Sequence, residues 1–281
     1  MKLIKPSFEI IEQAPGIQGI KKQIELAGRT CYKSEDKITD TSCEEFVSRM
    51  VNSGHGAMLE HGTVYLYVEY GSPAEDNRYF TGTDILIKYS KNKYSKVNSE
   101  MINNYLHRVY ITTNYRVLVE NGWLDDLQYQ CEPTECHEKR ITVKFILPIS
   151  ISREFIRHRT ASFAEQSTRY CNYSKSKFGE ELTFITPYWY DNVDSYTKNE
   201  FDRGLQYAEG YYMFMVDKGM KPQEAREILP LCTKTELVMT AFISDWEHFC
   251  SLRTAGSAHP QARELAIPLQ EQFIKKGYIN G

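Results

Sequence analysis

The amino-acid sequence predicts one α/β or α+β domain, and three observations lead to this prediction. The chain has 281 residues, which at ~150 residues per domain corresponds to one or two domains and allows a sizeable core. Hydrophobic residues make up 41% of it, as in ordinary globular proteins. Strand-like and helix-like segments interleave along the chain, which is typical of a mixed domain.

Strands are predicted where β-branched and aromatic residues gather between turn residues. In chain order these segments are residues 8–14, 63–70, 108–113, 140–147 and 233–242. Pro15-Gly16 ends the first predicted strand and Pro148 ends the fourth. A Pro-Gly pair marks a turn, and proline lacks the N–H that pairs with a neighbouring strand.

Helices are predicted where apolar residues recur every three or four positions. In chain order these segments are residues 17–27, 41–52, 115–120, 150–156, 201–216, 222–229, 244–252 and 260–275. Glycine ends helices readily, so Gly28 and Gly219 mark two of the expected ends. Ser244 and Glu247 fit a capping box at the start of the seventh helix.

Residues 71–139 differ from the rest of the chain and are predicted to be an insertion. The stretch Lys88–Lys96 is rich in Lys, Tyr, Ser and Asn, which is typical of a solvated loop. Without these 69 residues the chain would have 212, a length that fits one domain. We therefore expect residues 1–281 to form one domain that carries an insertion, which thickens a subunit interface, covers a cleft or decorates the surface.

Charge and hydropathy exclude several classes of protein. The 34 Lys and Arg against 37 Asp and Glu give a net charge of −3, which argues against a generally basic nucleic-acid coat. No apolar run approaches the ~20 residues that span a bilayer, and the first ten residues lack the apolar stretch of a secretory signal. We expect a cytoplasmic protein without a nucleic-acid or membrane partner.

The seven cysteines are scattered without the spacing of a disulfide framework, so reduced thiols are expected. Only Cys131, Cys136 and His137 resemble a metal-binding spacing. A second close pair of ligands is missing, so no metal is predicted.

The densest polar cluster is residues 157–170, RHRTASFAEQSTRY. Its three arginines can grip phosphate oxygens bidentately, and its four Ser and Thr hydroxyls can supplement them. A solvated helix end is the alternative, but such a basic cluster in a chain of net charge −3 favours a site for a small anion. Neither G-x-G-x-x-G after a strand nor a P-loop occurs, so a nucleotide would be bound by other means.

Arg157-His158-Arg159, followed after seven residues by Ser167, resembles the RHR-x7-S signature of the flavin-dependent thymidylate synthases, the ThyX family. The longer stretch resembles the family's RHRxxSxNExSxRY, with Ala164 in place of Asn. Five other blocks are similar to the family's ARxCY, GHxxxxEH, RxxLP, FLxLR and HAQ segments, in the same order. They are Ala27–Tyr32, Gly54–His61, Arg226–Pro230, Phe249–Arg253 and His259–Gln261.

The resemblance implies a largely antiparallel central sheet flanked by helices, in a homotetramer whose active sites are shared between subunits. It implies conversion of dUMP to dTMP, with methylenetetrahydrofolate as the carbon donor and FAD, reduced by NADPH, as the hydride source. The residues it assigns to dUMP are Glu154, Arg157, Glu165, Gln166, Ser167, Arg169, Arg226 and Arg253. Those it assigns to FAD are His55, Arg157, His158, Arg159, Glu165 and His248.

Three of these assignments have alternatives. Arg253, the residue with the implied catalytic role, would polarise the pyrimidine, but an arginine at a helix end also complements the helix dipole. Ser167 has no obvious activating base beside it in the sequence, so phosphate binding is preferred over a nucleophilic role. His55 could be a plain turn residue.

Departures from the family pattern complicate the flavin assignment. Ala57, Ala164, Phe242 and Ser244 stand where polar contacts are usual, and each lost contact costs ~1 kcal/mol if nothing replaces it. Glu154 stands where the family has a substrate-contacting Gln, and a carboxylate is less favourable near phosphate. We therefore expect weaker or shifted FAD binding.

Two alternatives to the enzyme stay open. The first is a non-catalytic homologue that binds dUMP through an intact nucleotide site and has a degraded flavin site. The second is an RNA-binding module that uses the Arg- and Tyr-rich cluster. The net charge and the lack of an RRM, KH or OB signature argue against RNA binding.

Overall fold

The computed structural model describes residues 1–71, 79–103, 106–169, 173 and 181–280. Its strands are β1 Lys2–Ile4, β2 Ser7–Ile11, β3 Thr63–Tyr70, β4 Lys96–Asn103, β5 Leu106–Asn114, β6 Arg140–Pro148, β7 Ser162–Glu165, β8 Thr183–Ile185 and β9 Lys234–Phe242. Its α-helices are α1 Gly16–Tyr32, α2 Ser42–Asn52, α3 Gly56–Leu59, α4 Tyr79–Ser90, α5 Tyr115–Asn121, α6 Ile149–Phe155, α7 Ser195–Asp217, α8 Pro222–Ala225, α9 Ile243–Arg253 and α10 Pro260–Lys275. Short 3₁₀ turns cover Glu35–Lys37, Leu124–Tyr129, Tyr190–Asn192 and Arg226–Ile228.

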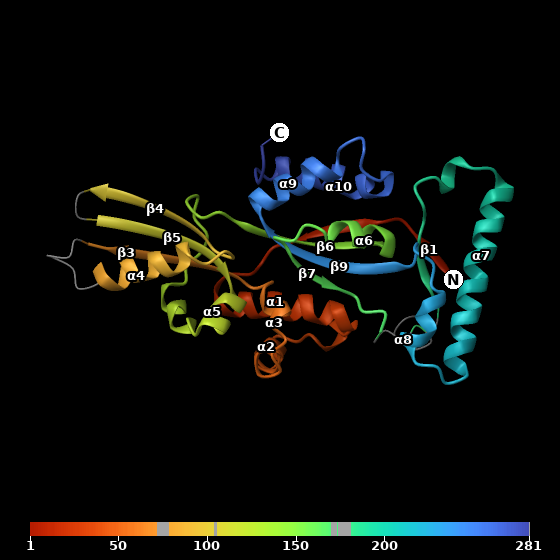
Figure 1. Cartoon of the computed structure of the whole chain (residues 1–281), viewed down its shortest axis with the longest axis horizontal. Helices are drawn as coiled ribbons and strands as arrows, with labels where there is room; N and C mark the ends of the chain where they lie inside the picture. The colour runs from red at the N-terminus through yellow and green to blue at the C-terminus, as the bar shows by residue number, and fades with distance from the viewer. Residues whose placement is uncertain (72–78, 104–105, 170–172, 174–180, 281) are drawn as a thin grey trace.

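The central sheet has four antiparallel strands in the order β2-β6-β9-β7. Helices cover both of its faces, with α9 and α10 on one side and α1 and α3 on the other (Figure 1). Strand β9 is almost entirely buried, as expected for a strand between two covered faces. The predicted class, a mixed fold with a largely antiparallel sheet flanked by helices, is confirmed.

The core on the α9 and α10 side is built around aromatic rings. Trp246 of α9 is fully buried and lies edge-on to Phe249 and Phe273, with ring centroids 5.2 and 5.3 Å apart. The opposite face is tighter, because Ala27 of α1 packs on Ala164 and Val238. Small residues on that face let the helix backbone approach the sheet closely.

A second antiparallel sheet has the strand order β3-β5-β4. It lies at the end of the molecule opposite helix α7 (Figure 1). Strands β4 and β5 and helices α4 and α5 all come from residues 71–139, whereas β3 precedes them. Its core also takes Ile20 and Ile24 from α1. One helix therefore contributes to both cores. The organisation of the chain as one domain with an insertion stays a prediction.

Several predicted elements match the observed ones and several do not. The strand over 63–70 and the helix over 260–275 have the predicted bounds. Helix α1 continues past Gly28 to Tyr32, because that glycine allows close packing: a Cβ there would lie 2.4 Å from the Phe46 ring. The glycine marks a helix contact and not a helix end.

The other corrections concern the insertion and α9. Helix α4 runs to Ser90 and β4 begins at Lys96, so the predicted loop shrinks to a turn of five residues. Helix α9 begins at Ile243, one residue before Ser244, so the predicted capping box at Ser244 does not form. The Ser244 hydroxyl instead donates a 2.5 Å hydrogen bond to Glu138. Among the described residues, no helix is both long and apolar enough to cross a membrane.

Candidate functional site

Residues 166–169, which follow β7, bring three sequence blocks together. The Ser167 amide donates to the Cys31 carbonyl at 2.9 Å, and Arg226 donates to the Thr168 hydroxyl at 3.1 Å. The Ser167 hydroxyl accepts from the Arg169 amide at 3.3 Å. Three blocks that resemble the family, in α1, in the RHR stretch and near α8, thus meet in one loop; Tyr170, the last residue of the stretch, lies outside the described residues.

A buried carboxylate with three lysines lies beside this loop. Glu236 of β9 is 3% exposed and pairs with Lys33 and Lys144, each at 2.6 Å, and with Lys234. Burial alone raises the pKa of Glu236, but the three lysines outweigh it and lower that pKa to about 2. Lys234 also donates to the Gln166 side chain at 3.1 Å.

Sequence analysis missed this lysine cluster, although a signal for it exists. Lys234 and Glu236 are charged residues two positions apart in a strand that is otherwise apolar or hydroxylic. Alternate residues of a strand point to the same face, so two charges at that spacing on a buried strand must face partners. Those partners are Lys33, which directly follows α1, and Lys144 of β6, and they could not be named without the fold.

Arg253, the predicted catalytic residue, is held by two predicted site residues from the region of α6. Its Nη1 donates to the Glu154 carboxylate at 3.1 Å and its Nη2 to the Glu154 carbonyl at 2.7 Å. Its Nε donates to Nε2 of His158 at 3.1 Å. Three hydrogen bonds from two neighbouring elements fix this guanidinium in place.

His158 is neutral in this arrangement. Burial, followed by the charges of Arg253 and His248, lowers the pKa of His158 to about 4. A neutral ring has a lone pair with which Nε2 accepts from Arg253. The His248 ring lies edge-on at 5.9 Å, so these two predicted flavin residues are neighbours of the predicted catalytic arginine.

Glu165 faces the sheet surface that α6 covers, because strand β7 alternates. Its neighbour Ala164 is buried against α1 on the other surface. Burial raises the pKa of Glu165, against the effect of nearby Ser152 and Thr235. Glu165 and Glu154 therefore lie on the same side of the central sheet, while Ala164 fills with apolar packing the place where the family pattern has Asn.

His55 and Arg159 line two different cavities. His55 lies in one of about 370 Å³ together with Cys31 and Tyr32. Arg159 lies in one of about 920 Å³, between the central sheet and residues of the insertion. Arg116 of α5 lines both cavities. No hydrogen bond or ion pair in the described part of the chain joins His55 or Arg159 to Arg253.

Arg140, at the start of β6, is a buried residue that sequence analysis did not single out. It donates to the Glu60 carbonyl at 2.9 Å and to the Ser162 hydroxyl at 3.2 Å. Its Nε has no hydrogen-bond partner among the described residues, and burial lowers the pKa of Arg140 to about 10. It lines the 920 Å³ cavity and also a cavity of about 230 Å³.

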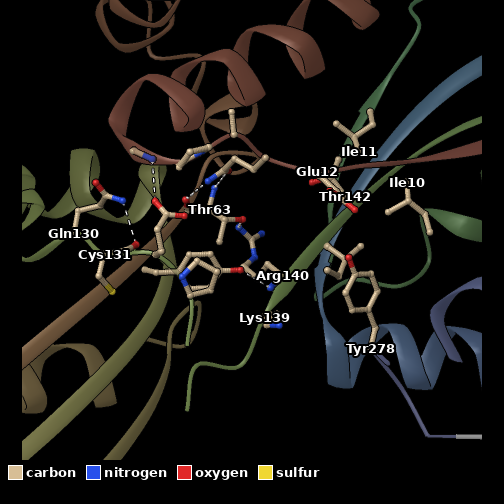
Figure 2. A pocket seen from close by; sticks show the side chains of 18 residues that line it. Ile10, Ile11, Glu12, Thr63, Gln130, Cys131, Lys139, Arg140, Thr142 and Tyr278 are labelled. Carbon is tan, nitrogen blue, oxygen red and sulfur yellow. Dashed lines mark hydrogen bonds between the residues drawn. The ribbon is translucent and has the colours of Figure 1, made fainter. Parts of the chain in front are cut away.

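Figure 2 shows that smaller cavity, where Arg140 lies near Thr63 and opposite residues of β2 and the C-terminal Tyr278. None of the predicted site residues is among those that line it. Its volume of about 230 Å³ is below the ~300 Å³ at which ligand pockets usually begin. We therefore do not include this cavity in the candidate site.

Phe242 and Ser244, two further departures from the family pattern, lie against residues 71–139. Lys96 and Arg140 lie over the Phe242 ring at 5.6 and 5.4 Å from its centroid. Ser244 donates to Glu138, and Glu138 pairs with Lys96 at 3.8 Å. Ala57 lines the His55 cavity.

The cysteine and histidine spacing does not form a metal site in the described residues, where no group of three or more His, Cys, Asp or Glu side chains could hold an ion. His137 has both ring nitrogens engaged, with Nδ1 accepting from the Thr134 amide at 3.1 Å and Nε2 bonded to the Leu66 carbonyl at 3.1 Å. Cys131 lies 3.8 Å from Nε2.

Comparison with known proteins gives one family. The family model described as thymidylate synthase complementing protein matches residues 133–276, which are 144 of the 281 residues. A flavin-dependent thymidylate synthase of Pyrococcus horikoshii is 30% identical over 127 residues, covering 44% of this chain and 50% of the relative. One of Geobacter sulfurreducens is 28% identical over 120 residues, covering 42% and 49%. The chain spans about half the length of the curated relatives it matches.

A solved structure was also found: a UMP/dUMP methylase PolB from Streptomyces cacaoi bound with 5-Br dUMP. It is 18% identical to this chain, with a TM-score of 0.44 over 98% of this chain and 93% of the other.

Proposed function

Because the chain belongs to the family of thymidylate synthase complementing proteins, we propose that it is a flavin-dependent thymidylate synthase. The reaction replaces the hydrogen at C5 of dUMP by a methyl group, whose carbon comes from methylenetetrahydrofolate. The relatives named above are flavin-dependent, and we propose FAD as the flavin and NADPH as its reductant. When bound, FAD supplies the hydride that completes the methyl group.

The observation that carries this proposal is the convergence of separate sequence blocks on the RHR stretch. Arg253 is hydrogen-bonded to Glu154 and His158, which are 99 and 95 residues away in the sequence. Arg226 is hydrogen-bonded to Thr168, which is 58 residues away in the sequence. A chance resemblance of short motifs would not require those motifs to meet, whereas a shared active site does.

The phosphate and sugar of dUMP are assigned to Gln166, Ser167 and Arg169, and the edge of its pyrimidine ring to Arg226. Arginine forks and a hydroxyl suit phosphate oxygens, and the nearby lysine cluster adds one positive charge beyond its two glutamates, Glu35 and Glu236. Within the described residues, no His, Asp or Glu contacts the Ser167 hydroxyl. That environment supports phosphate binding over a nucleophilic role.

The uracil ring is assigned to Arg253, with Glu154, Arg157, Glu165 and Gln166 around the nucleotide. C5 of uracil becomes a better nucleophile when negative charge at the N3–C4 edge is stabilised by a cation. The Arg253 guanidinium is already oriented by Glu154 and His158, so it needs little rearrangement when that charge develops.

FAD is assigned to His55, Arg157, His158, Arg159, Glu165 and His248. The described residues fit a flavin dinucleotide in two respects: the 920 Å³ cavity beside Arg159 is large enough for a cofactor, and Arg140 in its wall has a buried Nε without a partner. His55 and Arg159 line two different cavities, which supports active sites shared between subunits, as in the homotetramer that we propose. A cytoplasmic location is part of the same proposal.

The proposal is tested by adding FAD to the purified protein and recording its absorbance spectrum. A flavin spectrum should appear, and dTMP should form from dUMP, methylenetetrahydrofolate and NADPH. A colourless protein that takes up no FAD and forms no dTMP would contradict the proposed enzyme.

A second candidate is a nucleotide-binding protein without catalysis. It is favoured by one observation: Ala164 is sealed in apolar packing, and Phe242 is covered by Lys96 and Arg140, so these positions offer a flavin no polar side chain of their own. Titration with dUMP in the absence of flavin distinguishes the two, because tight dUMP binding that FAD does not influence, without turnover, favours the second candidate.

A further inference from the structure

Part of the insertion forms a wall of the 920 Å³ cavity. The turn between α4 and β4, taken together with Lys96 at the start of β4 and called here the turn of residues 91–96, contributes Lys91, Asn92, Lys93, Tyr94 and Lys96 to its lining. Arg159 and Phe242 lie in the same lining. A segment to which sequence analysis gave no role therefore faces a residue that the proposed function assigns to the flavin.

The turn is held in a defined shape. The Asn92 side chain accepts from the Tyr94 amide at 2.9 Å and from the Ser95 hydroxyl at 3.2 Å. The Ser95 hydroxyl also bonds to Thr113 of β5 at 2.8 Å. An asparagine that bonds its own backbone two residues on is a typical turn device, and here it fixes where the lysines stand.

The cavity has a surplus of positive charge. Its cationic lining residues are Lys91, Lys93, Lys96, Arg116, Arg140 and Arg159, and its carboxylates are Glu60, Glu120 and Asp245, which leaves an excess of three positive charges. Arg116 satisfies Glu60 and Glu120, each at 2.6 Å. Within the described part of the chain, Lys91, Lys93 and Arg159 have no acidic partner. A concave surface of this kind attracts a multiply charged anion.

The same turn contacts the positions where this chain departs from the family pattern. Lys96 lies over Phe242 and pairs with Glu138, which holds Ser244. Residues of the insertion thus place polar groups next to Phe242 and Ser244, the two positions where the polar contacts of the family pattern are missing. The residues assigned to the phosphate and sugar of dUMP, Gln166, Ser167 and Arg169, are not in this lining, so the surplus charge serves a different anion.

We propose that the turn of residues 91–96 binds the diphosphate of the flavin dinucleotide, in place of the polar contacts missing at Phe242 and Ser244. This inference rests on the proposed function. Lysine ammonium groups on a rigid turn act as point charges toward phosphate, and the surplus of three positive charges is enough to neutralise the two negative charges of a diphosphate. A nicotinamide dinucleotide carries the same group, and the experiment separates the two sources.

The test compares the wild-type protein with the triple variant Lys91→Gln, Lys93→Gln, Lys96→Gln. We expect the Kd for FAD, from quenching of flavin fluorescence, to rise about tenfold or more, because charge-assisted contacts to phosphate are lost. The Kd for dUMP should not change. The matched control replaces Lys218, Lys221 and Lys275, exposed lysines outside the cavity lining, by Gln, and should keep the wild-type FAD affinity.

Three results would overturn the inference. One is an unchanged Kd for FAD in a triple variant that melts at the wild-type temperature. Another is a loss of NADPH affinity in the FAD-loaded protein with FAD affinity intact, which would assign the turn to the nicotinamide dinucleotide. Should the triple variant not fold, the single variant Lys93→Gln gives the answer, with FAD affinity expected to fall about threefold and an unchanged affinity contradicting the proposal. A wild-type protein that binds no FAD at all would contradict the proposed function itself.

Discussion

Two regions of the molecule differ in how their charged side chains are paired: the Arg253 and Glu236 groups of the four-stranded sheet, and the turn of residues 91–96 beside the three-stranded sheet. Around the four-stranded sheet, charges are bound to one another: Arg253 is held by Glu154 and His158, and Glu236 by three lysines. Beside the three-stranded sheet, Lys91 and Lys93 face a cavity without acidic partners in the described residues. The first region is organised before a ligand arrives, whereas the second leaves charge for a ligand to neutralise. We expect chemistry to depend on the first region and cofactor affinity on the second.

The sharpest test of that division is Arg253→Ala. Removal of one preorganised group that stabilises developing charge lowers kcat by about a hundred- to a thousandfold, so dTMP formation should nearly cease. Oxidation of NADPH by bound flavin should largely survive, because the turn of residues 91–96 and its cavity are untouched. Both rates can be followed in one spectrophotometric assay.

A matched control for this variant is Arg203→Ala, which removes a helix-surface arginine paired only with Glu200 among the described residues. It should keep both activities. If Arg253→Ala unfolds the protein, the arginine has a structural role at the end of α9, and the division between the two regions fails at its most important residue.

The buried cluster of Glu236 and its three lysines should make the free energy of unfolding depend on pH. The pKa of Glu236 is about 2 in the folded protein and ~4.3 in an unfolded chain, so the unfolded state binds the proton first as the pH falls. The stabilisation, about 3 kcal/mol by linkage, is complete above pH ~4.3 and is lost as the pH falls toward 2. Urea unfolding at several pH values measures it.

Glu236→Gln is the variant that tests this cluster, because it removes the charge and keeps the shape. It should lower the free energy of unfolding at neutral pH, with the difference from wild type shrinking below pH ~4.3. A difference that does not change with pH would mean that the cluster's charges do not stabilise the fold, and that this region is less tightly organised than its hydrogen bonds indicate.

Ser167→Ala should weaken dUMP binding about tenfold, the effect of one lost hydrogen bond to a charged group, while the rate at saturating dUMP changes little. Calorimetric titration and steady-state kinetics separate the two quantities. A complete loss of turnover with normal dUMP affinity would instead make Ser167 a nucleophile.

The smallest expected effect is that of Glu154→Gln. The carboxylate neutralises Arg253 through a 3.1 Å contact, and an amide would keep the hydrogen bond while leaving the arginine its charge. We expect dUMP affinity to increase about threefold. Weaker binding would show that the pairing with Glu154 is required to hold Arg253 in place.

Local signals made much of the fold predictable. Strand β3 alternates between buried and half-buried residues from Val64 to Tyr70, and α10 begins with a proline at its first position; both were predicted with their observed bounds. Strands β1, β7 and β8 have three or four residues and exist because a partner strand is present, which one sequence does not reveal. Gly28 misled the prediction, since a glycine at a close helix contact and one at a helix end look alike.

The candidate site was predictable in its residues but not in its grouping. The RHR stretch contains its own polar pattern, whereas the contact of Arg253 with Glu154 joins residues 99 positions apart. Lys91 and Lys93 belong to a segment, Lys88–Lys96, whose composition is that of an ordinary solvated loop. Their place in a cavity with Arg159 depends on how α4 and β4 are positioned, and that is set by tertiary packing and not by local pattern.

Arg140 has a consequence for how the protein unfolds. Its guanidinium is buried and bonded both to Glu60, before the three-stranded sheet, and to Ser162 in the four-stranded one, while α1 is part of both cores. If the three-stranded sheet detached by itself, the Arg140 guanidinium would keep Ser162 but lose the Glu60 carbonyl as an acceptor, at a cost of about 1–3 kcal/mol. The two sheets should therefore lose their structure in one cooperative transition, with fluorescence and circular dichroism reporting the same midpoint.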